Sequence, residues 1–308
     1  MIKRTLYFGN PAFLSLKLKQ LVVSFPETKD SEGNIQKKEP VTSPIEDLGM
    51  IVLDSRQLTI TQALISELLD NNCAIVTCNG KHMPDGLLLP LSGHTVQSER
   101  FREQIDASIP LRKQLWQQTV ERKIVNQEAV LRHTTGSTHP NMCIWATKVR
   151  SGDVENMEGR AAAYYWKSLF PHNPTFIRDR DAEGINMLLN YGYAILRAIV
   201  ARALVASGLL PTLGIHHHNR YNAYCLADDI MEPYRPYVDR IVYDFVAHNS
   251  GVAQLNIESK TALLGISTED VVIDGTRHPL SVAAGLTASS LRKCFSGESR
   301  KISYPTLE

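Results

Sequence analysis

The sequence predicts an α+β protein in which a small β-rich N-terminal domain precedes a larger all-helical domain. Three observations predict this fold class. Residues 1–90 contain several short apolar segments of strand length. A stretch with several Pro and Gly residues, Gly80–Gly93, follows them. Beyond it, apolar residues recur with helical spacing. We therefore expect a β-rich domain at 1–85, a linker at 86–97 and a helical domain at 98–308.

The first domain is expected to contain one helix among its strands. The polar, lysine-rich stretch Pro26–Ser43 predicts a long hairpin tip or a mobile loop. Thr61 is a suitable N-cap for a helix that Asn71 and Asn72 end. The candidate strands are Thr5–Phe8, Phe13–Leu18, Leu21–Phe25, Gly49–Leu53 and Ala74–Thr77.

The second domain begins with a long helix on which Leu111 and Leu115 mark an apolar line. Its basic residues indicate either a solvated helix face or a track for phosphates. These residues are Arg112, Lys113, Arg122 and Lys123. The longest apolar periodic segment, Ala182–Ser207, predicts a central buried helix. Further helices are expected at Val238–Val246 and Leu280–Phe295, followed by a polar tail, Ser296–Glu308, that suits a mobile segment ordered by DNA or a partner.

Composition excludes several classes of protein. The apolar content of 43% is ordinary for a globular protein, and no run of 18 apolar residues predicts a membrane span. The N-terminal MIKRTLYFGN has too short an apolar part for a signal peptide. Five cysteines without a CxxC pair argue against disulfides and against a cysteine zinc site. A cytoplasmic location is expected.

The net charge of +1 does not by itself indicate nucleic acid. Its distribution is uneven, because residues 94–150 carry 9 basic and 5 acidic side chains. A local positive surface is what phosphate binding needs, although a solvated helix face explains it equally well.

The chemistry-bearing stretch is Gly214–Arg240, which contains three adjacent histidines and several acids. Asp229 and Glu232 are three residues apart, so in a helix both carboxylates lie on one face. In an extended segment, consecutive histidine side chains point to opposite sides, and at most one or two reach a common centre. A polar loop is the ordinary alternative for such a run.

A second segment with candidate functional residues, Glu155–Phe170, lies upstream. If this segment is helical, Glu158 shares an apolar stripe with Ala162, Tyr165, Trp166 and Leu169. A carboxylate on such a stripe is costly to bury unless a cation meets it. Glu158, one of the histidines and Glu232 together suit a site for Mg²⁺ or Mn²⁺. The alternative reading makes Glu158 a boundary residue or the partner of a nearby arginine.

Two segments resemble a known family. GIHHHN followed by LADDIMEPYRPYVDR, and ENMEGRAAAYYW upstream, resemble the signatures of the CRISPR-associated integrase, the universal core protein of spacer acquisition. The resemblance extends over TITQALISELLDNNCAIVTCNGKHMPDGLLLPL and NMLLNYGYAILRAIVARALVASGLLP, and its details are most similar to integrases of type II systems.

The resemblance implies a role for each matching residue. Glu158, His217 and Glu232 fall on the family's three metal ligands, with His216 and His218 leaving the choice of histidine open. Asp229 falls on an accessory acid that orients a ligand. Arg235 falls on a basic residue placed to hold the scissile phosphate.

The implied function is metal-dependent transesterification, which joins the 3′-ends of captured foreign DNA fragments (protospacers) to the CRISPR repeat. The implied assembly contains homodimers formed largely through the N-terminal domain, around a small ferredoxin-like second acquisition protein. In a type II system the RNA-guided nuclease and an accessory acquisition protein are further expected partners.

Three other functions suit the same residues. A structure-specific nuclease acting on branched DNA would use the same ligands with water as nucleophile. A catalytically silent DNA-binding scaffold would not depend on Glu158 at all. A helical small-molecule metallohydrolase would lack salt-sensitive DNA binding.

Overall fold

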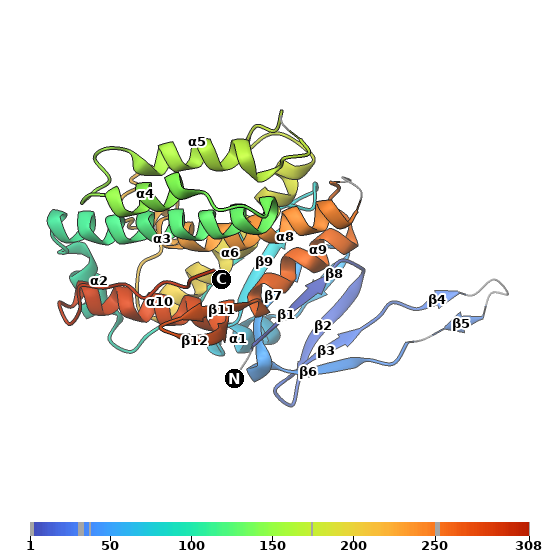
Figure 1. Cartoon of the computed structure of the whole chain (residues 1–308). Coiled ribbons are helices and arrows are strands. Elements are labelled where there is room, and N and C mark those ends of the chain that lie inside the picture. Colours follow the sequence, from blue (N-terminus) through green and yellow to red (C-terminus); the bar gives the residue numbers. More distant parts are fainter. Residues whose placement is uncertain (1–2, 30–33, 37, 174, 250–252, 308) are drawn as a thin grey trace. The chain divides into compact units, whose positions relative to one another are not determined.

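The computed structural model describes residues 3–29, 34–36, 38–173, 175–249 and 253–307. The chain forms two compact units, Met1–Leu91 and Ser92–Glu308 (Figure 1). The boundary between them falls inside the linker predicted at 86–97. The first unit is rich in strands and the second is mainly helical, so the α+β fold class is confirmed.

The first unit contains two four-stranded sheets. In one sheet β1, β7 and β9 are parallel and β10 is antiparallel to β9. In the other, β3 pairs antiparallel with β2 and β6, and β8 pairs parallel with β2. The strands of the first sheet are β1 (Arg4–Phe8), β7 (Leu48–Leu53), β9 (Ala74–Cys78) and β10 (Pro84–Leu88). Those of the second are β6 (Val41–Pro44), β3 (Gln20–Ser24), β2 (Ala12–Lys17) and β8 (Leu58–Ile60).

Alternating side chains and one amphipathic helix build the core of this unit. Leu14 on β2 and Leu21 on β3 are buried, whereas their neighbours along each strand are more exposed. Helix α1 (Gln62–Asp70) adds Leu64 and Leu68, four residues apart and fully buried. Thr61 is at the N-cap position as predicted, but its side chain makes no capping hydrogen bond. A short 3-10 turn, η1 (Ile45–Asp47), precedes β7.

The stretch Pro26–Ser43 contains the predicted hairpin. Strands β4 (Thr28–Lys29) and β5 (Ile35–Gln36) pair antiparallel, and β6 begins at Val41. Residues 30–33 and 37 of this stretch lie outside the described residues.

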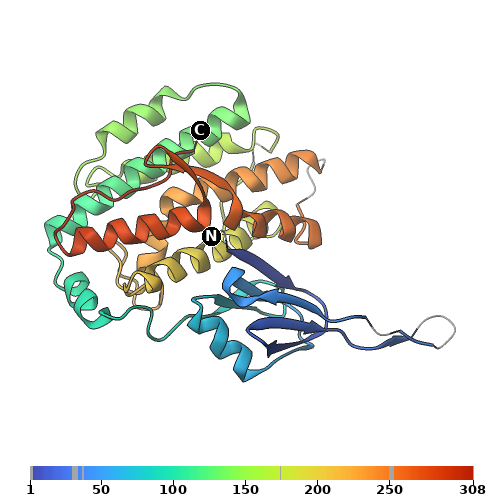
Figure 2. The same cartoon turned by 90° about the horizontal axis from the view of Figure 1, so that it is seen from below.

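The second unit is built around two long helices. Helix α3 (Ile109–Thr135) begins at Ser108, whose side chain accepts from the Leu111 amide, and ends at Gly136 with a φ of +68°. It packs against α4 (Pro140–Lys148), α5 (Met157–Leu169) and α8 (Arg235–His248). Helix α6 (Ile185–Ala206) packs against α8 and α10 (Leu280–Phe295) (Figure 2).

The remaining elements of this unit are shorter. They are α2 (Gln97–Ile105), α7 (Cys225–Met231), η2 (Glu232–Tyr234), α9 (Ile257–Leu264), η3 (Gly265–Thr268), β11 (Asp270–Ile273) and β12 (Thr276–Pro279). Strands β11 and β12 form an antiparallel hairpin, which the prediction of a wholly helical domain did not contain.

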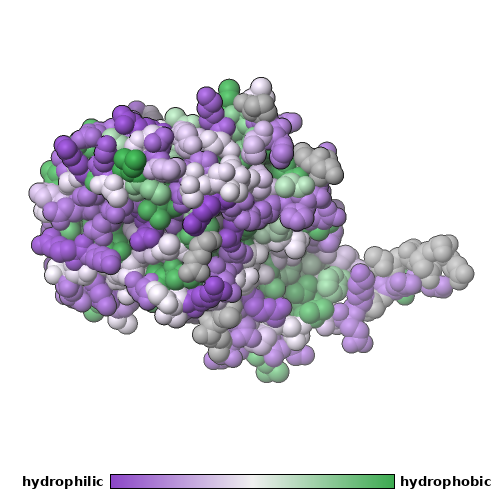
Figure 3. Space-filling model, viewed as in Figure 1, coloured by the Kyte–Doolittle hydropathy of each residue, from purple (hydrophilic) through white to green (hydrophobic). Residues whose placement is uncertain are grey.

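Helix α6 is the central buried helix that the sequence predicts. Among the described residues it alone has the length and apolar composition of a membrane span, but 72% of its most apolar window is buried within the protein. On the face shown in Figure 3, hydrophilic side chains predominate over the helical unit and apolar ones are scattered among them. The burial of α6 is that of a core helix inside a folded unit.

The prediction of a mobile C-terminal tail is wrong for its described residues. Ile302, Tyr304 and Leu307 are buried. The Tyr304 and Thr119 hydroxyl groups lie 2.8 Å apart, and Asn126 donates to the Pro305 carbonyl at 3.1 Å. The tail therefore completes the hydrogen bonding of buried polar groups on α3.

Candidate active site

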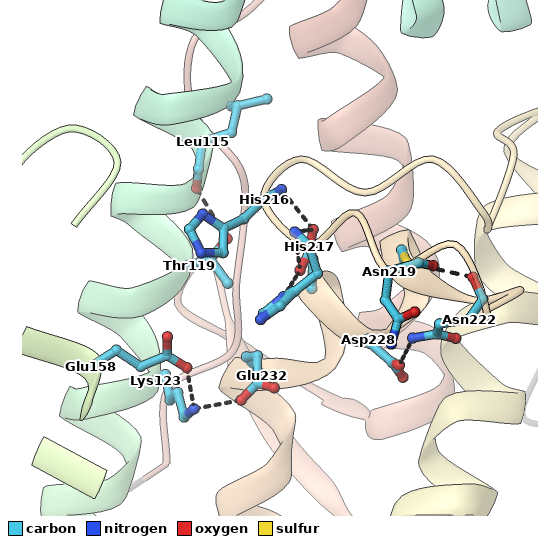
Figure 4. A network of polar contacts seen from close by, with 12 residues as sticks. Leu115, Thr119, Lys123, Glu158, His216, His217, Asn219, Asn222, Asp228 and Glu232 are labelled. Carbon is cyan, nitrogen blue, oxygen red and sulfur yellow. Dashed lines mark hydrogen bonds and ion pairs between the residues drawn. The ribbon is translucent and has the colours of Figure 1, made fainter. Parts of the chain in front are cut away.

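Three charged side chains from three different elements meet at one point (Figure 4). Lys123 lies on α3, Glu158 in the first turn of α5, and Glu232 at the start of η2. The Lys123 Nζ donates a hydrogen bond to Glu158 Oε1 at 2.6 Å and lies 2.6 Å from Glu232 Oε2. The two carboxylates therefore share one cation.

The way in which α5 begins places Glu158. The Asp153 carboxylate accepts hydrogen bonds from the amides of Met157 (2.8 Å) and Glu158 (3.0 Å). The Asn156 side chain accepts from Gly159 at 3.1 Å. These capping hydrogen bonds satisfy the free amides of the first turn. They fix the start of α5 and therefore the position from which the Glu158 side chain projects.

The predicted stripe along this helix is only partly the buried one. Tyr165 and Leu169 are buried, but Ala161 is fully buried where Ala162 was expected. Glu158 lies at the edge of this face, with its side chain 22% exposed. A cation does meet it, as the cost of burying a carboxylate requires, and that cation is Lys123.

Asp229 on α7 orients His217 on the loop before it. Asp229 is fully buried, and its Oδ1 lies 2.5 Å from His217 Nδ1. It also accepts from the backbone amides of His216 (2.8 Å) and His217 (3.3 Å). The hydrogen bond to Asp229 raises the pKa of His217, although burial opposes this. A proton held on Nδ1 leaves Nε2 available as a ligand atom.

The surroundings of the three histidines distinguish them. The His216 ring stacks on the buried Trp116 ring, with centroids 4.2 Å apart and planes 3° from parallel. The His217 ring meets the edge of the same Trp116 at 5.4 Å. Figure 4 shows the His217 ring directed toward the side on which Glu158 and Glu232 lie. This geometry favours His217 as the histidine that faces both carboxylates.

Gly214 permits the loop to fold back onto Asp229. A Cβ at this position would lie 2.4 Å from the His217 carbonyl oxygen and 2.8 Å from Asp229 Oδ2. Neither atom has room for such a contact. A glycine is therefore required at position 214, because the His217 backbone and the Asp229 side chain approach it too closely for a Cβ atom.

Arg235 contacts Glu232 directly. Its Nε lies 2.9 Å from Glu232 Oε1, and its guanidinium lies over the Tyr193 ring at 4.7 Å from the centroid. Burial raises the pKa of Glu232, but the charges of Arg235 and Lys123 outweigh burial and hold that pKa below its ordinary value. Glu232 is thus an ionised ligand candidate at neutral pH.

The donor set suits a divalent cation. In the part of the chain that the structure describes, no three His, Cys, Asp or Glu side chains are already grouped closely enough to hold a metal. The chemistry nevertheless fits, because Glu158 Oε1 and Glu232 Oε2 each lie 2.6 Å from the Lys123 Nζ and so face the same cation. His217 adds an imidazole nitrogen. The point between the carboxylates is held by the Lys123 ammonium group.

The prediction that Lys123 lies on the outer basic surface of its helix is wrong. Its side chain is only 11% exposed. Thr119 and Gln127, one turn to either side of it, are buried as well. A line of polar residues at positions i, i+4 and i+8 was the available signal, since such a line inside a packed helix needs internal partners.

A second buried carboxylate lies behind the site. Asp239 on α8 is 1% exposed and accepts hydrogen bonds from the Tyr165 hydroxyl (2.8 Å) and the Tyr193 hydroxyl. Burial raises the pKa of Asp239 to about 6, against the opposing effect of both tyrosines. Tyr165, which neighbours Glu158 on α5, is thereby a core residue.

Asp239 gives a pH dependence with a defined sign. The folded protein binds this proton more tightly than the unfolded chain, whose pKa is near 3.8, so stability is lost as pH rises from about 4 to about 6. The expected loss, relative to Asp239→Asn, is roughly 3 kcal/mol. Urea unfolding of both proteins between pH 4 and pH 7 measures it. A difference in unfolding free energy that is constant with pH would contradict the assignment.

Comparison with known proteins identifies the family. Residues 7–260 match the family model described as CRISPR associated protein Cas1. The chain belongs to the Cas1 family. A CRISPR-associated endonuclease Cas1 from Neisseria meningitidis serogroup C (strain 8013) is 38% identical over 243 residues, which are 79% of this chain and 75% of that protein.

Solved structures share the fold of Cas1. A casposase bound to integration product superimposes with a TM-score of 0.77, at 18% identity, over 98% of this chain and 92% of that one. A Cas6-RT-Cas1–Cas2 complex gives a TM-score of 0.71, at 19% identity, over 97% of this chain and 36% of the other. Family membership confirms the resemblance seen in the sequence and the predicted function class, a CRISPR-associated endonuclease and integrase of spacer acquisition.

Proposed function

We propose that this Cas1 protein joins DNA by metal-dependent transesterification, with Glu158, His217 and Glu232 as ligands of Mg²⁺ or Mn²⁺. The observation that supports this most strongly is the convergence of Glu158 and Glu232, from α5 and η2, on one shared cation. His217 faces the same side, and Asp229 engages its Nδ1.

In the proposed reaction, the 3′-hydroxyl oxygen of a captured fragment attacks a phosphorus atom at the CRISPR repeat. A new P–O bond forms, the bond to the old strand's 3′-oxygen breaks, and that strand leaves with a 3′-hydroxyl. The proton of the attacking hydroxyl passes to solvent, and solvent returns a proton to the departing 3′-oxygen. The divalent cation, when bound, polarises the phosphoryl group and stabilises the leaving oxygen.

The protein's own side chains have separable roles. Glu158 and Glu232 supply carboxylate oxygens, and Asp229 keeps the proton on His217 Nδ1 so that Nε2 faces the site. No protein nucleophile is needed. This agrees with Tyr165, whose hydroxyl is already donated to Asp239.

Arg235 has two roles in the proposal. Its Nε contact holds Glu232 in place, which the sequence did not predict. Its remaining donors are proposed to contact the scissile phosphate, as the family resemblance implies. The Arg235 side chain as a whole is 22% exposed.

The proposed partners are DNA and the small ferredoxin-like protein Cas2. Support comes from two structures with the same fold, one of a casposase with its integration product and one of a complex that contains Cas1 and Cas2. We further propose a homodimer through the first unit, and a type II nuclease with its accessory protein as the source of protospacers. A cytoplasmic location remains a prediction.

Strand transfer tests the proposal against its rivals. Labelled short duplexes ending in a 3′-hydroxyl or a 3′-dideoxy sugar would be incubated with a repeat-bearing supercoiled plasmid, Mn²⁺ and the partner protein. Joining is expected only with the 3′-hydroxyl. Equal nicking with both duplexes and no joining would establish a nuclease. DNA binding with neither product would leave a silent scaffold.

A further inference from the structure

The Lys123 ammonium group occupies the point between two predicted metal ligands. It is 2.6 Å from Glu158 Oε1 and 2.6 Å from Glu232 Oε2. A magnesium ion binds oxygen at about 2.1 Å. An ammonium group and a divalent cation cannot both lie this close to the same two oxygens, because they would overlap and repel each other.

Lys123 is placed differently from a surface ion-pair partner. Its side chain is 11% exposed, and those of Glu158 and Glu232 are 22% and 9% exposed. Glu232 also contacts Arg235, whereas no side chain other than Lys123 forms an ion pair with Glu158 among the described residues. Removing this lysine would leave two carboxylates facing each other without the cation that they share.

Removing Lys123 lowers the free energy of unfolding by an amount that depends on whether metal is present. Breaking a buried ion pair by deleting one partner is strongly destabilising, since the other charge remains buried and unpaired. A divalent cation between the same oxygens would compensate that charge. The lysine therefore stabilises the metal-free protein, and a bound metal makes it dispensable.

We propose that Lys123 is a resident cation of the metal-free site, which a divalent metal must displace in order to bind. The proposal rests on the proposed function, because it takes Glu158 and Glu232 as metal ligands. Lysine suits the exchange, since its compact charge sits on a flexible four-carbon stem and can swing aside. Metal affinity in the native protein is accordingly weakened by this competition.

The test compares the 308-residue protein with Lys123→Met, which keeps an unbranched side chain one atom shorter and removes its charge. Mn²⁺ binding is measured by calorimetric titration, and thermal unfolding is followed in EDTA and in excess MnCl₂. Lys123→Met is expected to melt at a lower temperature than wild type in EDTA. Its Mn²⁺ dissociation constant is expected to fall by about tenfold or more, because the competing charge-assisted contact is gone.

The rise in melting temperature on adding Mn²⁺ should then be larger for Lys123→Met than for wild type, since tighter binding stabilises the folded state more. Lys113→Met, an exposed lysine on the same helix, is the control and should match wild type in both measurements. Lys123→Arg keeps the charge. It should fold in EDTA and bind Mn²⁺ no more tightly than wild type, which preserves the test if Lys123→Met does not fold without metal.

The outcomes separate this proposal from the one on which it rests. Equal or weaker Mn²⁺ binding by Lys123→Met, or tighter binding by Lys123→Arg, would overturn displacement while leaving the metal site intact. Wild type that binds no Mn²⁺ and transfers no strand would overturn the proposed function itself, and displacement with it.

Discussion

Replacing Glu232 by glutamine is expected to lower the strand-transfer rate by about a thousandfold or more, because the proposed metal would supply several kcal/mol of transition-state stabilisation. The substitution keeps the size of the side chain and removes the anion that Lys123 and Arg235 both contact. Initial rates of label joining at saturating Mn²⁺ measure the effect.

DNA binding should survive this substitution, since it removes a negative charge from a surface that meets phosphates. Glu121→Gln provides a matched control, because Glu121 is an exposed glutamate of α3. It should transfer strands at the wild-type rate. Glu232→Gln activity within tenfold of wild type would rule out Glu232 as a metal ligand.

Replacing Asp229 by asparagine is expected to raise the half-saturating Mn²⁺ concentration for strand transfer by about 10–100-fold, the usual effect of removing a partner that orients a metal-bound histidine. Asp229 accepts from the His217 ring and from two backbone amides, and an amide cannot replace all of these contacts. A high metal concentration should restore much of the rate, unlike the result with Glu232→Gln.

Asp228→Asn is the control for this prediction. Asp228 precedes Asp229 on α7 but faces Arg197 and Asn222 instead of His217. Its half-saturating Mn²⁺ concentration should stay near the wild-type value. An equal shift in both variants would show that the loop, and not the His217 contact, is what the substitutions disturb.

The sequence proposed the site residues by two routes. Spacing suggested Glu158, one of the histidines and Glu232, whereas the family resemblance implied the choice of His217 and the roles of Asp229 and Arg235. Asp229 and Glu232 lie three residues apart, and both contribute to the site. It did not predict Lys123, because α3 buries side chains around much of its circumference and the inner and outer basic residues look alike in sequence. Short strands such as β8 and β10 were missed for a related reason, since their few residues show no clear alternation.

The tail shows a different limit. Tyr304 and Leu307 are ordered by contacts with Thr119 and Asn126, which lie more than 180 residues earlier in the chain. A polar, Pro-containing segment has no periodic pattern that reveals such docking. Helix α4 was not predicted, although Pro140 is well suited to the first turn of a helix.

The most direct test of the central claim is strand transfer by wild type, Glu158→Gln and His217→Ala, each with Mn²⁺ or with EDTA. Duplexes with free 3′-hydroxyl ends and the repeat-bearing plasmid are the substrates. We predict label joined to plasmid only by wild type and only with Mn²⁺. Joining by wild type in EDTA, or by either variant at the wild-type rate, would contradict a metal site formed by Glu158, His217 and Glu232.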